Sequence, residues 1–206
     1  MSVQNPSGND KQKPMIVFAG RSNVGKSSTI RALTGKKIRV GKHPGSTRWE
    51  LALDMGPVDF VDIPGFGYMV KSSKESIEEM KTQIVKWLED WSESMALAVL
   101  IIDISLFREL VERWSGRGEI PIDVEFYSFL SEISPNVIVV ANKVDKLKKR
   151  AIPKELDYLH QQLLDAVPNK TPNVVTTSAL KKTGIDDLRD LIESLLLKRG
   201  INAPTW

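Results

Sequence analysis

The chain has 206 residues, of which 41% are hydrophobic and 27% charged, with a formal net charge of +3 and no cysteine. This composition is that of a globular protein, and it excludes a disulfide framework and a thiolate metal site. The length suits one domain, and the small excess of Lys and Arg permits a nucleic-acid partner without requiring one. No apolar run is long enough to cross a bilayer and the polar first 13 residues lack the apolar core of a signal peptide, so we expect a cytoplasmic protein without membrane contact.

The first predicted strand and helix flank a glycine-rich turn. A β-rich run at Met15–Ala19 is followed by Gly20–Ser27, which matches the pattern G-x-x-x-x-G-K-S, and by a helical pattern at Lys26–Leu33 that Gly35 closes. Glycines let backbone N–H groups converge on an anion, and the helix N-terminus adds partial positive charge. The residues expected to contact phosphates here are Gly20, Arg21, Ser22, Asn23, Val24, Gly25, Lys26, Ser27 and Ser28.

Two side chains of this loop carry distinct expected roles. The ammonium of Lys26 is predicted to reach the β- and γ-phosphates of a nucleoside triphosphate. The hydroxyl of Ser27 is predicted to bind Mg²⁺, a hard cation that prefers oxygen ligands.

A basic loop rich in hydroxyl groups follows the first helix. Its Pro44–Arg48 run lies between that helix and the next strand, where a segment that senses the γ-phosphate is expected. Thr47 is the predicted second protein ligand of Mg²⁺, and Ser46 is the alternative, because spacing cannot separate the two hydroxyls. Gly45 completes the expected contacts of this loop.

A hairpin is expected next, with strands at Trp49–Asp54 and Val58–Ile63 joined by a Gly-Pro turn. The second strand ends in a D-x-x-G pattern, and ligand crevices of open α/β sheets lie at such strand ends. Asp62 is expected to hold a water of the Mg²⁺ shell, and the N–H of Gly65 is expected to meet the γ-phosphate. The whole predicted element is Asp62, Ile63, Pro64 and Gly65.

The rest of the chain alternates helices and strands without an internal repeat. Apolar residues between Ser73 and Trp91 fall on one helical face, and Ser72 with Glu75 fits a capping box at its start. The later expected elements are a strand at Met95–Asp103, helices at Phe107–Trp114 and Ile122–Leu130, a strand at Val137–Ala141, a helix at Lys154–Ala166, a strand at Asn173–Thr177 and a helix at Asp186–Leu197. This order predicts an α/β domain over residues 14–200, with residues 1–13 as a flexible N-terminal tail and residues 201–206 as a C-terminal tail.

Two short motifs follow the last two strands. Asn142-Lys143-Val144-Asp145 matches N-K-x-D, in which the Asp145 carboxylate can accept hydrogen bonds from guanine N1–H and N2–H₂. Adenine offers no such pair and would leave the carboxylate unsatisfied, so the pattern selects GTP over ATP. Lys143 is expected to lie along the base and Asn142 to tie the two loops together. Ser178-Ala179-Leu180 matches S-A-x, in which the N–H of Ala179 is expected to donate to guanine O6.

Together these motifs resemble TRAFAC-class P-loop GTPases. The segments GRSNVGKSS, PGSTR, DIPGFGY and NKVDK are similar to those of the EngB (YihA) family, and the resemblance covers about residues 14–198. Bacterial members commonly carry T-K-x-D where this chain has N-K-x-D, and the run RELVERWSGRGEIPIDVEFY resembles archaeal members. The resemblance implies a three-layer Ras-like fold whose mostly parallel, six-stranded sheet has the order 2-3-1-4-5-6.

The same resemblance implies a Mg²⁺-dependent GTPase that switches between GTP and GDP states. It also implies roles in assembly of the large ribosomal subunit and in cell division and septation, and we expect a monomer. The alternative is a basic module that binds RNA or the ribosome through lysine-rich runs around residues 146–150 and 181–182, with the nucleotide mainly structural.

The expected hydrolysis is slow, because a Ras-like enzyme has Gln directly after D-x-x-G and this chain has Phe66, which cannot orient a water. Asn23 resembles the Asn of potassium-activated GTPases, so K⁺ is a candidate second cation; the alternative is that Asn23 only stabilises the turn. The predicted catalytic residues are Lys26, Thr47, Gly65 and Asn23, and the predicted metal ligands are Ser27, Thr47 and, through water, Asp62.

Overall fold

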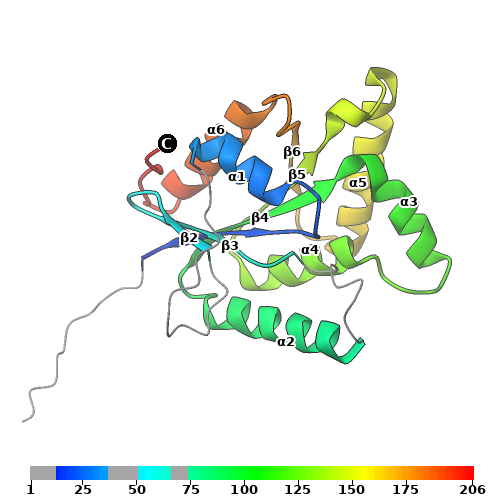
Figure 1. Ribbon diagram of the computed structural model, residues 1–206, viewed down its shortest axis with the longest axis horizontal. Coiled ribbons are helices and arrows are strands. Elements are labelled where there is room, and N and C mark those ends of the chain that lie inside the picture. The colour runs from blue at the N-terminus through cyan, green and yellow to red at the C-terminus, as the bar shows by residue number, and fades with distance from the viewer. Residues whose placement is uncertain (1–12, 37–50, 66–73) are drawn as a thin grey trace, which may run out of the picture.

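The computed structural model of the chain describes residues 13–36, 51–65 and 74–206. One six-stranded sheet runs through the centre of this part of the chain, with the order β2-β3-β1-β4-β5-β6 (Figure 1). Its strands are β1 (Met15–Ala19), β2 (Leu51–Asp54), β3 (Asp59–Asp62), β4 (Met95–Asp103), β5 (Val137–Asn142) and β6 (Asn173–Thr177). Neighbouring strands are parallel except in the β2–β3 hairpin, so the strand order expected from the sequence is confirmed.

Helices cover both faces of the sheet (Figure 1). The helices are α1 (Lys26–Thr34), α2 (Lys74–Asp90), α3 (Ile104–Ser115), α4 (Ile122–Ile133), α5 (Ile152–Ala166) and α6 (Ile185–Leu197). Side chains of α1 and α6 share one buried cluster with the sheet, whereas those of α2 to α5 share the other. The result is the three-layer α/β architecture that the alternating pattern predicted.

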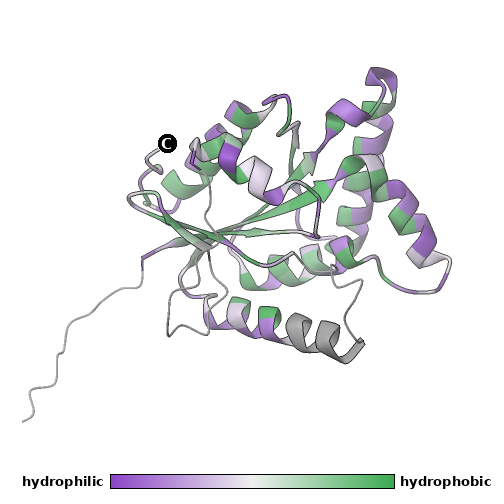
Figure 2. Cartoon of the chain, in the orientation of Figure 1, coloured by the Kyte–Doolittle hydropathy of each residue, from purple (hydrophilic) through white to green (hydrophobic). Residues whose placement is uncertain are grey.

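The division into two cores follows from the period of two along each strand. In β1, Ile16 and Phe18 belong to the core under α1 and α6, whereas Val17 and Ala19 belong to the opposite core. Strand β4 is buried along its whole length, as a central strand covered on both faces should be. In Figure 2 the sheet is accordingly green, and the helices alternate green with purple.

Several element boundaries differ from the sequence expectations. Helix α3 begins at Ile104 rather than Phe107, because Asp103 ends β4 and caps the helix at once: its carboxylate accepts a hydrogen bond from the Ser105 N–H at 3.2 Å. Helix α5 begins at Ile152 rather than Lys154, with a proline in its first turn, where the missing N–H is tolerated. Two unpredicted 3₁₀ turns, η1 (Val144–Lys146) and η2 (Lys149–Ala151), connect β5 to α5.

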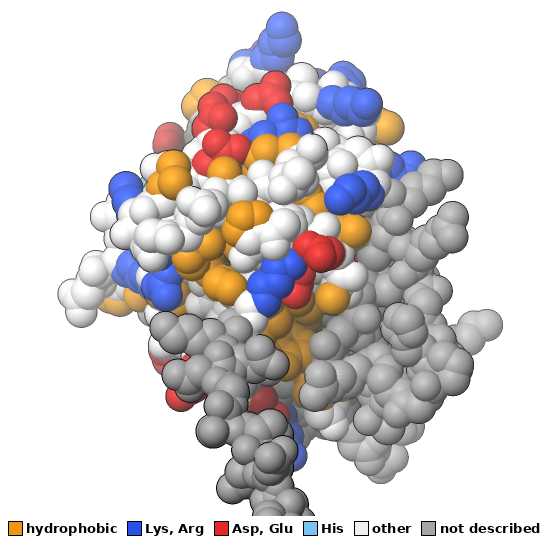
Figure 3. Space-filling model, turned by 90° about the vertical axis from the view of Figure 1, so that its left-hand side faces the viewer, with side chains coloured by type: hydrophobic (Ala, Val, Ile, Leu, Met, Phe, Trp, Pro, Cys, Tyr) orange, Lys and Arg blue, Asp and Glu red, His pale blue; other side chains and the backbone are white. Residues whose placement is uncertain are grey.

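The last six residues, which the sequence expectation assigned to a tail, pack on the edge of the domain. The N–H of Thr205 donates to the carbonyl of Met55 at 2.8 Å, next to the β2–β3 turn. The indole of Trp206 packs edge-on against Phe60, with 5.7 Å between ring centroids, and donates to the Glu193 carboxylate on α6. On the side of the molecule seen in Figure 3, acidic and basic side chains are interspersed with apolar ones.

Candidate functional site

The predicted motifs gather at the carboxyl ends of the parallel strands. The phosphate loop follows β1, the D-x-x-G element follows β3, the N-K-x-D element follows β5 and the S-A-x element follows β6. In an open α/β sheet these ends lie along one edge, which is where ligand crevices form. Two adjoining cavities of about 510 Å³ and 440 Å³ open at this edge.

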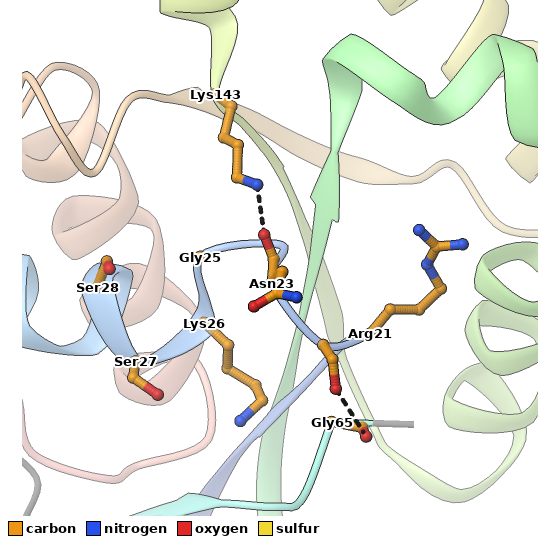
Figure 4. A pocket seen from close by; sticks show the side chains of 9 residues that line it. Arg21, Asn23, Gly25, Lys26, Ser27, Ser28, Gly65 and Lys143 are labelled. Atoms are coloured by element: carbon orange, nitrogen blue, oxygen red, sulfur yellow. Dashed lines mark hydrogen bonds between the residues drawn. The ribbon is translucent and has the colours of Figure 1, made fainter. Parts of the chain in front are cut away.

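The larger cavity lies over the phosphate loop (Figure 4). Its lining consists of Arg21, Ser22, Asn23, Gly25, Lys26, Ser27, Ser28, Gly65 and Lys143. The loop leads into the N-terminus of α1, whose first N–H groups and partial positive charge face the cavity. The geometry is therefore that of an anion site.

Two glycines, one in the phosphate loop and one in the D-x-x-G element, allow close contacts at this site. Gly25 has φ 100°, a left-handed conformation that side chains disfavour, and a Cβ there would collide with Nδ2 of Asn142. A Cβ at Gly65 would lie 2.8 Å from Oγ of Ser22, whose hydroxyl donates to the Gly65 carbonyl at 3.2 Å. The D-x-x-G element and the phosphate loop are thus in direct contact.

Asp62 joins the cation and the hydroxyl that were predicted to act on phosphate and Mg²⁺. Its carboxylate contacts the ammonium of Lys26, and its Oδ2 lies 3.4 Å from Oγ of Ser27. The ion pair is largely buried, with 5% of the Asp62 side chain and 10% of the Lys26 side chain exposed, whereas Ser27 is exposed. A hydroxyl and a carboxylate are the hard oxygen donors that Mg²⁺ prefers, so Ser27 and Asp62 fit this ion. Among the described residues no cluster of three His, Cys, Asp or Glu could hold a metal by itself.

The smaller cavity lies between α1 and the last two motifs. It is lined by Gly25, Ser28, Arg31, Ala32, Gly35, Asn142, Lys143, Asp145, Lys146, Ala179, Leu180 and Lys182. Three predicted guanine contacts, Asp145, Ala179 and Leu180, are therefore together at one wall, and Leu180 is 84% exposed. Oδ1 of Asp145 accepts a hydrogen bond from the hydroxyl of Ser178, which orients the carboxylate.

Asn142 connects the two cavities. Its side chain is buried, and its Nδ2 donates to the carbonyl of Val24 in the phosphate loop at 2.8 Å. Its Oδ1 accepts from the hydroxyl of Thr177 and from the N–H of Ala179, both at 3.1 Å. The sequence interpretation assigned this Ala179 N–H to guanine O6, and that assignment stays a prediction. In the structure, where β5 and β6 end side by side, the N–H donates to the carboxamide of Asn142.

Lys143 anchors the phosphate loop from above (Figure 4). Its ammonium donates to the carbonyl of Asn23 and to Oδ2 of Asp103, the latter at 2.7 Å. Asn23 and Lys143 both have positive φ, near 65°. Asp103 was missed by sequence reasoning, although its position at the end of a buried strand is the signal that singled out Asp62.

The remaining residues named from the sequence either lie outside the described residues or lie away from Lys26 and Ser27. Gly45, Ser46, Thr47 and Phe66 lie outside the described residues, as does Ser72 of the predicted capping box. Ile63 and Pro64 lead from β3 into Gly65, and Ile63 is buried in the core rather than open to the cavity. Arg21 points away from Lys26 and Ser27 (Figure 4).

In the described residues, no helix has the length and apolar character needed to cross a membrane.

The fold and this arrangement of loops define a P-loop nucleotide-binding domain. A family model described as "50S ribosome-binding GTPase" matches residues 15–143, more than half of the chain. A probable GTP-binding protein EngB from Methanosarcina barkeri is 39% identical over 184 residues, which cover 88% of this chain and 87% of that protein. The chain therefore belongs to the EngB family of GTPases.

Two further comparisons agree with this assignment. A probable GTP-binding protein EngB from Pyrococcus horikoshii is 50% identical over 133 residues, covering 65% of this chain and 62% of that relative, so the match spans under two thirds of its length. A crystal structure of a probable GTP-binding protein engB superposes with a TM-score of 0.77 at 39% identity, covering 90% of this chain and all of the other. The likeness to archaeal members expected from the sequence is confirmed.

Proposed function

We propose that this chain binds GTP with Mg²⁺, hydrolyses it slowly and acts as a nucleotide-dependent switch on the large ribosomal subunit. The observation that carries the proposal is the link made by Asn142. One buried carboxamide joins the phosphate loop at Val24 to Ala179 in the lining of the smaller cavity. The groups that contact the phosphates and the base of a guanine nucleotide would therefore be held in a fixed relative position.

Each residue has a role that its surroundings support. Lys26, now against Asp62, would turn its ammonium to the β- and γ-phosphates, and the N–H groups at the start of α1 would surround the β-phosphate. Ser27 and Asp62 would hold Mg²⁺, directly and through water, with Thr47 as the further proposed ligand. Bound Mg²⁺ supplies charge neutralisation between the β- and γ-phosphates. Gly65, which already touches Ser22, would report the γ-phosphate to the segment that follows it.

Slow hydrolysis follows from the residue after D-x-x-G. Phe66 offers no hydrogen bond to a water, so charge developing in the transition state needs another source of stabilisation. We include K⁺ as a candidate, seated in part by Asn23, whose backbone is held by Lys143 beside the cavity. Equal hydrolysis rates in K⁺ and Na⁺ at matched ionic strength would remove this part of the proposal.

The ribosomal partner rests on the family and on surface charge. The matching family is described as ribosome-binding, and Lys148, Lys149 and Arg150 are exposed beside the guanine wall, as are Lys181 and Lys182. Clustered cations favour phosphate backbones through counterion release. The roles in cell division and septation remain an implication of the family resemblance.

Two measurements, made one after the other, test the proposal. Titration of the purified protein with fluorescent GDP, followed by competition with GTP and ATP, should show strong preference for guanine. Sedimentation with purified large ribosomal subunits should then show co-migration with a non-hydrolysable GTP analogue and not with GDP. A Lys26→Ala variant is the control that should lose the nucleotide-dependent difference. Equal ATP and GTP binding would refute the guanine assignment, and failure to co-sediment in either state would refute the ribosomal role.

A further inference from the structure

A buried carboxylate lies beside Arg21 of the phosphate loop and belongs to none of the sequence motifs. Asp123 is in the first turn of α4 and is 3% exposed. Its Oδ2 lies 3.5 Å from Nε of Arg21, the residue that follows Gly20 in the loop. Within the described part of the chain, neither Oδ1 of Asp123 nor Nε of Arg21 has a hydrogen-bond partner. A buried charge so weakly compensated is costly to a fold and calls for an explanation.

Two charged side chains, Arg21 and Asp103, act on the carboxylate of Asp123. Arg21 faces it from the phosphate loop and Asp103 faces it from the end of β4, where Asp103 is itself paired with Lys143. Burial raises the pKa of Asp123, the Arg21 guanidinium lowers it and the Asp103 charge adds to the rise, so that the pKa is about 6. At neutral pH the carboxylate is therefore ionised, and each of the two buried acids is paired with one cation of the nucleotide site: Asp103 with Lys143 and Asp123 with Arg21.

We propose that Asp123 is a positioning residue for nucleotide binding: its ionised carboxylate holds the Arg21 guanidinium against α4 and thereby fixes the phosphate loop. This inference rests on the proposed function, because it assigns Asp123 to the same site. Arg21 acts as the connection: it lines the phosphate cavity, and its side chain extends away from Lys26 and Ser27 (Figure 4).

The pair adds a separate anchor to the loop. Asn142 fixes the loop at Val24, Lys143 fixes it at Asn23, and both come from the end of β5. The Asp123–Arg21 pair holds the loop two residues before Asn23, and its carboxylate comes from α4 rather than β5. A loop held from two elements presents its N–H groups to phosphate without first paying the entropy of ordering them.

Thermodynamic linkage makes the proposal testable through pH. If nucleotide binds best when Asp123 is ionised, then protonation of Asp123 below pH 6 weakens binding, and nucleotide binding lowers the pKa of Asp123 by the same coupling. A residue that only supports the fold would show no such coupling. Nucleotide phosphates also titrate near this pH, so the measurement must compare variants rather than one protein at two pH values.

The test is the dissociation constant of fluorescent GDP from pH 5 to pH 8 for wild type, Asp123→Asn and Glu155→Gln. Glu155 is the matched control, because it forms a half-buried ion pair with Arg108 between α3 and α5, with Nε and Oε2 3.0 Å apart, away from the cavity. Asp123→Asn is expected to weaken binding about tenfold at pH 7.5, within the usual range of coupling energies, and this gap should close toward pH 5. Glu155→Gln should follow wild type at every pH.

A second variant keeps the proposal testable if Asp123→Asn does not fold. Arg21→Gln should weaken binding to a similar extent and remove the same part of the pH dependence, and the double variant should be no weaker than either single one. Equal affinities for wild type and Asp123→Asn, a gap that does not change with pH, or tighter binding by Asp123→Asn would each overturn the proposal. Failure of the wild type itself to bind GDP would instead refute the proposed function.

Discussion

The raised pKa of Asp123 predicts that the ligand-free protein is stabilised when this carboxylate is replaced by a neutral amide. An unfolded Asp titrates near 3.8, whereas Asp123 in the fold titrates at about 6. Between these values the folded state binds a proton that the unfolded state has lost, so stability falls as pH rises. The difference of about two pH units, at 1.36 kcal/mol each, corresponds to about 3 kcal/mol at pH 8.

Asn resembles the protonated acid in shape and carries no charge, so Asp123→Asn should remove this cost. We expect the variant to be more stable than wild type by about 3 kcal/mol at pH 8 and by about half as much at pH 5, where the fold already holds the proton. For a chain of this size, 3 kcal/mol corresponds to a rise in Tm of roughly 6–12 °C. The assay is urea unfolding of the nucleotide-free protein at both pH values, monitored by tryptophan fluorescence.

The refuting results are specific. A variant less stable than wild type at pH 8 would mean that the Arg21 pairing outweighs the burial of Asp123, contrary to the direction of its pKa. A gap that is the same at pH 5 and pH 8 would mean that Asp123 does not titrate in this range. Higher stability combined with weaker nucleotide binding would identify a group retained for function at the expense of stability.

Three further predictions address other parts of the chain. Asp145→Asn should weaken GTP binding by about 100-fold or more and favour xanthosine triphosphate, because sites built on hydrogen bonds discriminate by up to ~10⁴–10⁵. A competition titration measures the two affinities. An unchanged affinity for GTP would show that Asp145 does not contact the base. Gly25→Ala should abolish nucleotide binding and lower stability by about 1–3 kcal/mol, since it combines a positive φ with a collision at Asn142. Gly118→Ala, with φ 71°, open space and no place in either cavity lining, should cost only about 1–2 kcal/mol in urea unfolding and keep binding. Equal losses for these two glycine variants would contradict the collision argument. Trp206→Ala should lower the unfolding free energy by about 2 kcal/mol, less than for a fully buried tryptophan, and an unchanged urea midpoint would show that the C-terminal packing is not stabilising.

The sequence was sufficient for the order of the elements. Continuous apolar runs in Met15–Ala19 and Met95–Asp103, with helical periodicity between them, are typical of strands in a sheet that helices cover on both faces. Boundaries were less certain, because they depend on local capping. The helix at Ile104 starts early since Asp103 ends a strand and caps a helix at once, and the apolar pattern alone does not show both roles.

The motifs were also visible in the sequence, because phosphate loops and guanine elements need particular residues in a fixed local order. The sequence could not say which groups would join them. Asn142 reaches Val24 across 118 positions, and Lys143 reaches Asp103 across 40, so these contacts exist only because parallel strands end at one edge.

The sequence by itself determined the class of fold, the two ends of the nucleotide site and the membership of the EngB family, since each depends on local pattern and residue type. Only the tertiary structure decided that Asp123 pairs with Arg21 of the phosphate loop and that Trp206 packs on the hairpin. Neither residue belongs to a motif, and their surroundings come from segments distant in the chain. Burial and pKa are properties of those surroundings, and they arise when the layers pack together.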